Sequence, residues 1–235
     1  MRVRLALVFA LVAASSHAQG ESAASFRTAN ENAARSRWDE ATEGYAKLAS
    51  SGVRAPSLYW NWSQAAAANG KQGEAVWALI CARQLQPRDQ SVDREIERIR
   101  LELGLDPSEI SLGLAGDAVL GARRLHLDLV AALMFVISLV GATIRRTSIA
   151  LGFLMTGALL LAPFWIGSAQ GVRGVVVRKD APLVDIPRND AVPLATLREG
   201  EVIPLLSEEG EYFKVQDASG ARGFAHKSNV RRIAD

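Results

Sequence analysis

The pattern of hydrophobic and polar positions changes twice along the chain, and each part predicts a different kind of element. Residues 22–104 carry apolar positions at helical spacing, with breaks at "SSGVRAP", "ANGKQG" and "LQPRD". Residues 125–166 are almost continuously apolar. From Gly174 onward the period changes to two, which is typical of strands. The chain is therefore predicted to be a multidomain protein with an all-α domain, a long apolar region and a small all-β domain.

Self-comparison of the helical region indicates an internal repeat. The segment "RWDEATEGYAKLA" (37–49) aligns with "KQGEAVWALICAR" (71–83), so that Ala41 and Ala75 are 34 positions apart. A period of about 34 residues is that of the tetratricopeptide repeat, a helix–turn–helix unit. We expect residues 22–104 to form two such repeats followed by a capping helix.

The capping helix is expected to begin near Asp89, a residue type that caps helix N-termini, and to end at Gly104. Its densely charged face, "DREIERIRLE", is typical of a helix that closes a repeat array. Two repeats and a cap are fewer than the three or so units that an array normally needs. We therefore expect this domain to be marginal alone and to lean on a partner or on another copy.

The repeat register places several side chains on the concave surface, where such arrays usually bind partners. Asn30 and Gln64 occupy equivalent inward positions, and Phe26 and Trp60 are equivalent nearby. The two amides are candidates for holding an extended peptide, with Trp60 beside them. The alternative is that the amides are merely solvated and the aromatic rings form core between repeats.

The apolar region is interrupted near its centre by Arg145 and Arg146. One continuous helix would be about twice as long as a membrane is thick and would bury both arginines. Two transmembrane helices, 125–144 and 149–168, joined by a turn at 145–148, avoid that cost. We therefore predict a two-helix transmembrane hairpin in which the arginines mark a cytoplasmic turn.

The N-terminus resembles a secretory signal peptide. Arg2 and Arg4 precede a short apolar core, and small residues precede a cleavage point after Ala18, which gives a signal peptide of residues 1–18. The alternative is an uncleaved N-terminal helix. Together with the arginine turn, this segment predicts a protein of the bacterial inner (cytoplasmic) membrane with both folded domains extracytoplasmic. Residues 105–124 are expected to be a linker or a helix on the membrane surface.

Residues 172–235 contain short alternating strands separated by the turn signals "PRND", "REGE", "EEGE" and "DASGAR". Five such strands indicate a small β-barrel. The segments "LREGEVIPLL" and "EGEYFKVQDASGARGFAHKSNVRRI" resemble the bacterial SH3 fold. In an SH3-like barrel, Tyr212 and Phe224 are candidates for lining a ligand groove, and the alternative places them in the core and rim.

Composition and motifs exclude several classes of function. The 27 basic and 25 acidic residues are scattered, which gives no argument for nucleic-acid binding. The single cysteine, Cys81, lies in an apolar helical run and excludes an internal disulfide. His17, His126 and His226 lack metal-ligand spacing. The sequence also lacks the motifs of serine hydrolases, phosphate-binding loops and zinc enzymes, so no enzymatic activity, cofactor or metal is expected.

The order of these parts resembles BatE-like membrane proteins of Bacteroides aerotolerance-type (Bat) operons. The resemblance is most specific at the Phe26-to-Asn30 helix start, at the "SSGV…LYWN" junction and at "QPRD". It implies a non-catalytic part of a cell-envelope complex that works beside von Willebrand-type membrane proteins and, indirectly, a MoxR-type ATPase. We derive two hypotheses: a membrane-anchored adaptor that binds envelope proteins, and a module that attaches to peptidoglycan through the barrel.

Overall fold

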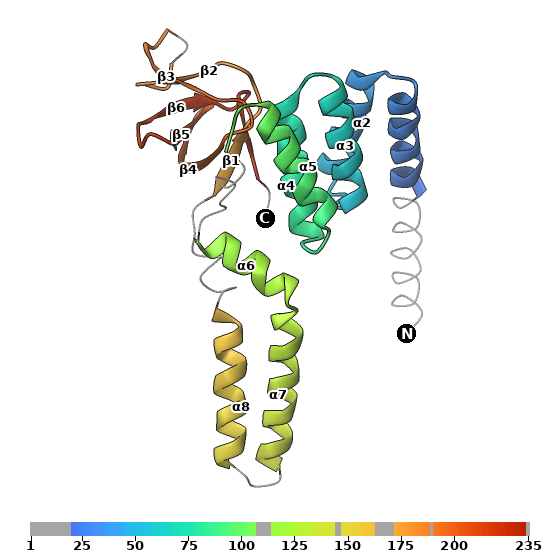
Figure 1. Cartoon of the computed structure of the whole chain (residues 1–235), viewed down its shortest axis with the longest axis vertical. Coiled ribbons are helices and arrows are strands. Elements are labelled where there is room, and N and C mark those ends of the chain that lie inside the picture. The colour runs from blue at the N-terminus through green and yellow to red at the C-terminus, as the bar shows by residue number, and fades with distance from the viewer. Residues whose placement is uncertain (1–19, 107–113, 144–146, 163–171, 189, 234–235) are drawn as a thin grey trace, which may run out of the picture.

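The computed structural model describes residues 20–106, 114–143, 147–162, 172–188 and 190–233. Figure 1 shows a helical domain (residues 20–106) beside a β domain (residues 172–233), with a separate pair of helices extending away from both. The predicted signal peptide, residues 1–18, lies outside the described residues, as do Arg145 and Arg146.

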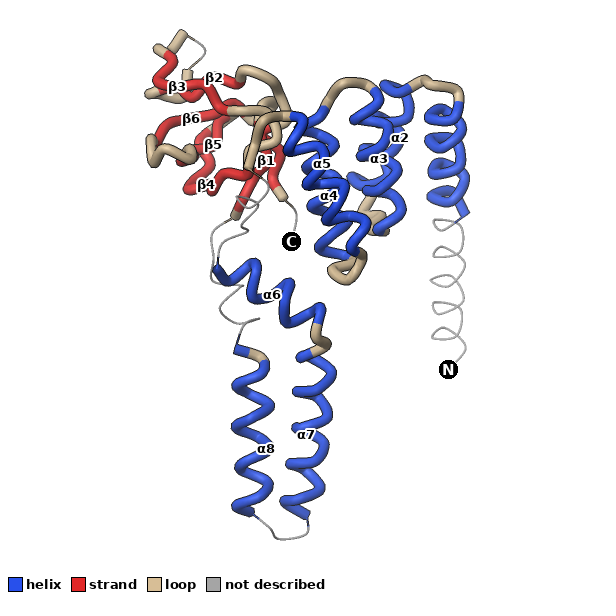
Figure 2. Tube along the Cα trace, in the orientation of Figure 1, coloured by secondary structure: helices blue, strands red, loops and turns tan. Residues whose placement is uncertain are grey.

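The helical domain is built from helices that each pack against the next one in the chain (Figure 2). Gly52 and Gly70 follow the second and third helices with positive φ angles, a conformation that glycine adopts without steric cost. Asp89 caps the last helix, because its carboxylate accepts a hydrogen bond from the Ser91 amide at 2.9 Å. The helices are residues 20–34, α2 (Trp38–Ser50), α3 (Pro56–Ala68), α4 (Gln72–Leu85) and α5 (Gln90–Glu102).

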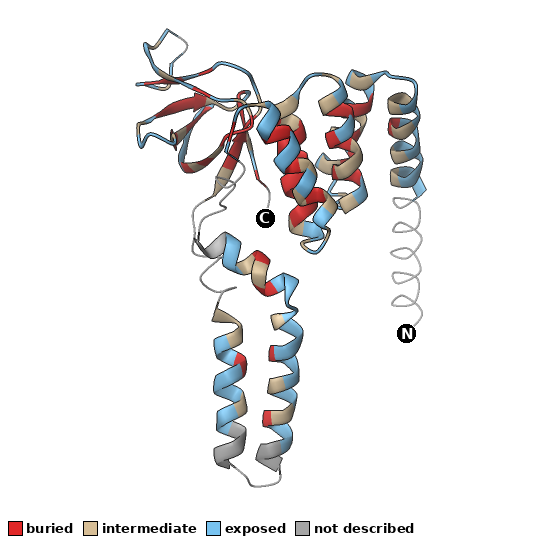
Figure 3. Cartoon of the chain, viewed as in Figure 1, coloured by how far each residue is buried: buried red, intermediate tan, exposed pale blue. Residues whose placement is uncertain are grey.

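Helix α4 is the centre of this domain. Every residue from Ala75 to Arg83 is buried, because α3, α5 and strand β1 (Arg173–Val176) all pack against the helix. A helix that is apolar around its whole circumference needs such surroundings. Cys81 belongs to this core and is buried. Figure 3 shows the contrast between the buried centre of this domain and the exposed outer helices.

The β domain is one antiparallel sheet with the strand order β3-β2-β6-β5-β4-β1-β7. The closed SH3-like barrel predicted for residues 172–235 is therefore wrong, because β3 and β7 are free edges of an open sheet. Alternating strands do not specify which strands pair, and Val175 and Ile233 pack against the helical core. The strands besides β1 are β2 (Ala181–Val184), β3 (Pro193–Leu197), β4 (Val202–Glu209), β5 (Tyr212–Gln216), β6 (Arg222–His226) and β7 (Val230–Arg232).

The apolar region forms α7 (Leu127–Thr143) and α8 (Thr147–Leu160), which pack against each other. Among the described residues, no helix combines the length and the apolar character needed to span a membrane. The predicted transmembrane helices at 125–144 and 149–168 are therefore wrong. So is the predicted inner-membrane location with two extracytoplasmic domains.

The error came from counting apolar residues as if all of them were helical. Leu125 and His126 form a turn before α7, and His126 has a φ of 52°, which lies outside the helical range. The described helix α7 therefore begins only at Leu127 and has 17 residues to Thr143, and the described helix α8 has 14. About 20 residues are needed to cross the hydrocarbon core.

The segment 105–124, expected to be a linker or a helix on the membrane surface, contains α6 (Leu114–Arg124). The last turn of α6 is held against the helical domain by its arginines. Arg124 Nε donates to the Pro87 carbonyl at 2.5 Å, and its guanidinium also pairs with Asp93. Arg123 donates to the Gln84 carbonyl at 3.3 Å. These contacts place two cations at the C-terminal end of α4, where the helix dipole favours positive charge.

The helical and β domains share a continuous interface. Trp77 Nε1 donates to the Arg232 carbonyl at 2.9 Å, and Arg100 donates to the Gly200 carbonyl at 3.0 Å. The Arg231 guanidinium lies over the rings of Trp62 and Trp77, at 4.8 and 4.3 Å from their centroids. The sheet of the same chain thus covers one side of the helical domain, which was expected to lean on a partner or on another copy.

Candidate peptide-binding groove

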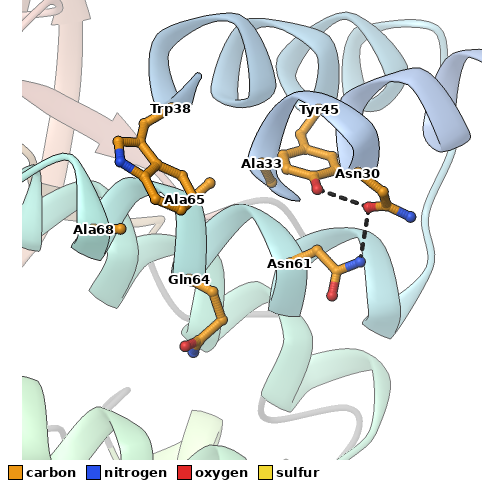
Figure 4. Close-up of a pocket in the computed structure, with 8 residues that line it drawn as sticks. All are labelled: Asn30, Ala33, Trp38, Tyr45, Asn61, Gln64, Ala65 and Ala68. Carbon is orange, nitrogen blue, oxygen red and sulfur yellow. Dashed lines mark hydrogen bonds between the residues drawn. The ribbon is translucent and has the colours of Figure 1, made fainter. Parts of the chain in front are cut away.

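A pocket of about 400 Å³ lies between the helix at 20–34, α2 and α3. We call it the amide groove, because three of its lining side chains are carboxamides (Figure 4). Apolar side chains form the rest of its wall. The lining residues are Asn30, Ala33, Trp38, Tyr45, Asn61, Gln64, Ala65 and Ala68.

A hydrogen-bond network fixes two of the three carboxamides. Tyr45 Oη donates to Asn30 Oδ1 at 2.7 Å, and Asn61 Nδ2 donates to the same oxygen at 2.9 Å (Figure 4). The oxygen of Asn30 therefore accepts two hydrogen bonds, which fills its acceptor capacity. Its amide nitrogen and the oxygen of Asn61 make no hydrogen bond with described residues. The pair presents one donor and one acceptor, the same combination that a peptide group carries.

Tyr45 orients this network. The side chain is buried in the helical core, where Phe26 packs against its ring with 6.1 Å between centroids. Burial raises the pKa of the Tyr45 hydroxyl, because the charged phenolate is poorly solvated there. The group consequently stays protonated at neutral pH and keeps its role as a donor to Asn30.

Gln64 lies on the same face of α3 as Asn61, since the two are three positions apart. Ala65 and Ala68 continue this face toward the C-terminal end of the helix. Gln64 Nε2 donates to Glu95 Oε1 on α5 at 3.4 Å. The hydrogen bond with Arg98 is the main reason why the pKa of Glu95 is lowered, and the Gln64 bond adds to it. Glu95 is therefore an ionised acceptor at neutral pH.

The structure brings together two of the predicted partner-binding residues. Asn30 and Gln64 both line the amide groove, as their equivalent repeat positions suggested. Trp60 does not line it, because this side chain is half-buried and packs against the helical core. Sequence reasoning missed Asn61 and Tyr45. The spacing of three between Asn61 and Gln64 was a usable signal for the first of them.

The predicted residues of the β domain lie in a different place. Tyr212 and Phe224 are each only 9% exposed and form a small cluster with Val184. Tyr212 pairs across the strands with His226, and their rings meet edge to face at 5.1 Å. The two aromatic residues therefore pack as part of the described sheet and do not form an open ligand groove.

The described residues give no indication of metal chemistry. No group of three or more His, Cys, Asp and Glu side chains among them could hold a metal ion. No protein-family model matches the chain, and a search of curated proteins gives no significant match. The geometry of the groove is therefore the basis of the functional argument.

Proposed function

We propose that this protein is a non-catalytic adaptor whose helical domain binds an extended segment of a protein partner in the amide groove. The observation that carries the proposal is the network of Tyr45, Asn30 and Asn61, which leaves a fixed donor and a fixed acceptor beside the pocket. An extended peptide offers an N–H and a C=O at every residue, so it can pair with both atoms.

The packing around the groove favours binding. Both hydrogen bonds to Asn30 restrict its side chain before a partner arrives, and less conformational entropy is lost on binding as a result. Trp38 and the alanines of α3 add an apolar wall to the pocket. Amides thus fix the register of the peptide backbone, and the apolar wall accepts one of its side chains.

We also propose that the helix at 20–34 with α2, and α3 with α4, are two tetratricopeptide repeats. Small residues at equivalent interior positions support this proposal, since Ala29 and Ser63 are both buried and 34 positions apart, and so are Ala41 and Ala75. The sequence resemblance to BatE-like proteins suggests the partners: cell-envelope proteins, including von Willebrand-type proteins, with a MoxR-type ATPase acting indirectly.

A peptide-display selection tests the adaptor proposal. Random dodecapeptides would be selected on the full-length protein, and the enriched peptides would be measured against the double variant Asn61→Ala/Gln64→Ala. We expect the affinity to fall about tenfold, because about 1.4 kcal/mol is lost when two amide contacts are removed. The matched control is Gln90→Ala, an exposed amide on α5, which should change nothing. Enriched peptides that bind the double variant as tightly as the wild type would refute the proposal.

A further inference from the structure

A second pocket, of about 390 Å³, lies where the helical domain meets the β domain. We call it the junction pocket. The start of α4 forms one side, the chain after β1 forms another, and the β6–β7 turn with β7 forms the third. The lining residues are Lys71, Glu74, Val177, Arg178, Lys227, Ser228 and Arg231.

The lining of the junction pocket has more basic than acidic side chains. Four of its lining side chains are basic and one is acidic, and that carboxylate, Glu74, is already paired with Arg231 at 2.8 Å. Lys71 and Lys227 pair with Asp39 and Glu208, two carboxylates outside the lining. The N-terminus of α4 has the positive end of a helix dipole, which the Glu199 carboxylate partly offsets through its hydrogen bond with the Gly73 amide. Once the three paired carboxylates are counted, Arg178 is the basic side chain of the lining that has no carboxylate partner among the described residues.

Two features make the positive charge available to a ligand. Arg178 is exposed and makes no ion pair or hydrogen bond with described residues. Asp39 and Glu208 are themselves solvent-exposed, with 74% and 53% of their side chains accessible. Exposed ion pairs contribute little and exchange readily, so a ligand carboxylate can replace them.

The amide groove leads to the junction pocket. Ala68 and Trp38 line the groove at the C-terminal end of α3. Immediately beyond them, Asp39 accepts hydrogen bonds from Asn69 at 2.8 Å and from Lys71 at 2.6 Å. Lys71 in turn lines the junction pocket. The corner between the two pockets therefore consists of residues that contact one another.

The length of the amide groove along α3 is short compared with an extended peptide. The face of α3 from Asn61 to Ala68 rises by about 10 Å at 1.5 Å per residue. An extended peptide covers that length in about three residues. A segment that pairs with the amides of Asn30 and Asn61 would therefore reach Ala68, at the end of the groove beside Asp39 and Lys71, after about three residues, and the residues that follow would approach the junction pocket.

We infer that the junction pocket binds acidic side chains of the same partner segment that occupies the amide groove. The inference rests on the proposed function, and it names the partner's chemistry: an extended segment with carboxylates a few residues beyond its groove-bound part. The β domain then serves as half of a binding site, because it supplies Arg178, Lys227 and Arg231.

Binding of labelled hexaglutamate to the full-length protein, followed by fluorescence anisotropy at low salt, tests the pocket. We expect hexaglutamate to bind about tenfold tighter than hexaglutamine, because only the former neutralises the pocket. Arg178→Gln should weaken hexaglutamate binding by about threefold to fivefold. Arg27→Gln, the same charge change at an exposed site on the first helix, is the control and should have no such effect.

Three results would overturn the assignment. The first is equal binding of both peptides, and the second is an equal effect of Arg178→Gln and Arg27→Gln. The third is displacement of hexaglutamate by inorganic phosphate, at matched ionic strength, as complete as by unlabelled hexaglutamate. That result would assign the pocket to free phosphate ions.

A second measurement tests whether one segment uses both sites. A peptide selected on the amide groove would be extended by three glutamates or by three glutamines. The glutamate version should bind about threefold tighter to the wild type and no tighter to Arg178→Gln. Equal binding to the wild type would remove the inference and leave the groove in place. A failed display selection, with hexaglutamate binding that still depends on Arg178, would instead remove the proposed function and, with it, the shared segment.

Discussion

The helical domain has two faces with different surroundings. The sheet covers one of them, and the amide groove opens on the other. On the covered face, Trp77, Gly73 and Arg100 each have a hydrogen-bond partner from the β domain. On the open face, the oxygen of Asn61 and the nitrogen of Asn30 keep unused capacity. The difference teaches that helices of one domain become core or open surface according to what lies against them.

The residues of α3 and α4 reflect these surroundings. Helix α4 is surrounded, and buried side chains occupy its whole circumference. Helix α3 is buried on one side only and carries Asn61 and Gln64 on the groove side. A polar group can be left partly unpaired where solvent or a partner can reach it, but burial without a partner would cost about 1–3 kcal/mol. The unpaired amide atoms therefore belong on the open face.

The largest effect on stability is expected from adding a side chain at Gly73, on the covered face. A Cβ atom there would lie 2.4 Å from the Val176 carbonyl oxygen and 2.9 Å from Val177 Cα, both of them backbone atoms. We expect Gly73→Ala to lower the free energy of unfolding by about 2–3 kcal/mol. Urea denaturation of the full-length protein measures it.

Gly121→Ala is the matched control for that substitution. Gly121 also lies in a helix, α6, and nothing lies within 4 Å of an added Cβ atom. The change should raise the free energy of unfolding by up to about 1 kcal/mol through helix propensity. Equal effects of the two substitutions would contradict the tight contact between α4 and β1.

Arg231→Met should have the next largest effect. The side chain pairs with Glu74 at 2.8 Å and lies over two tryptophan rings, so methionine removes both contacts and leaves the carboxylate with only its hydrogen bond from Trp62 Nε1 at 2.9 Å. We expect the free energy of unfolding to fall by about 2 kcal/mol, less than for a fully buried pair. Arg188→Met breaks an exposed ion pair with Asp190 and should lower the free energy of unfolding by less than about 0.5 kcal/mol. Similar losses in the two variants, measured by thermal unfolding, would argue against the stacked arrangement.

A smaller effect is expected on the open face from Tyr45→Phe. The substitution removes one hydrogen bond to Asn30 and keeps the aromatic ring, so the free energy of unfolding should fall by about 1 kcal/mol. Peptides selected on the amide groove should also bind more weakly, since Asn30 is then less firmly oriented. Unchanged peptide affinity would show that the hydroxyl does not orient the site.

The smallest expected effect is a loss of stability at alkaline pH. Burial raises the folded-state pKa of Tyr45 above its ordinary value of 10.0, so its contribution to stability is present below that value and is lost as the pH rises through the folded pKa. Tyrosinate absorbance should therefore show a component that titrates above pH 10, and Tyr45→Phe should reduce it. Burial also raises the pKa of Tyr59, which should remain in the variant. A titration curve left unchanged by Tyr45→Phe would contradict the burial of that hydroxyl.

Local pattern predicted the helical region well, because both its helices and its breaks are encoded by neighbouring residues. The repeat register also led to Asn30 and Gln64 in one groove. It could not lead to the bond between Asn30 and Tyr45, which depends on how far two side chains reach between helices.

The sequence could not predict the features that depend on contacts between residues far apart in the chain. Alternating strands predicted a β domain but not that β3 and β7 stay apart as edges, since strand pairing depends on tertiary packing. The apolar run around α7 did not reveal the turn at Leu125 and His126, because a hydrophobic residue can lie in a turn as well as in a helix. The junction pocket combines residues from two domains. Because these residues lie far apart in the chain, no sequence pattern indicated the pocket.

One contact at the interface has a consequence for the order in which the protein can form. Helix α4 begins after Lys71 and has no capping side chain of its own. Instead, the Glu199 carboxylate accepts a hydrogen bond from the Gly73 amide at 2.7 Å, across 126 residues of chain. During synthesis on the ribosome, the N-terminal end of α4 therefore lacks this cap until Glu199 has been made. A cap of this kind contributes about 1 kcal/mol, so the central helix of the helical domain gains its full stability only when the β domain is in place.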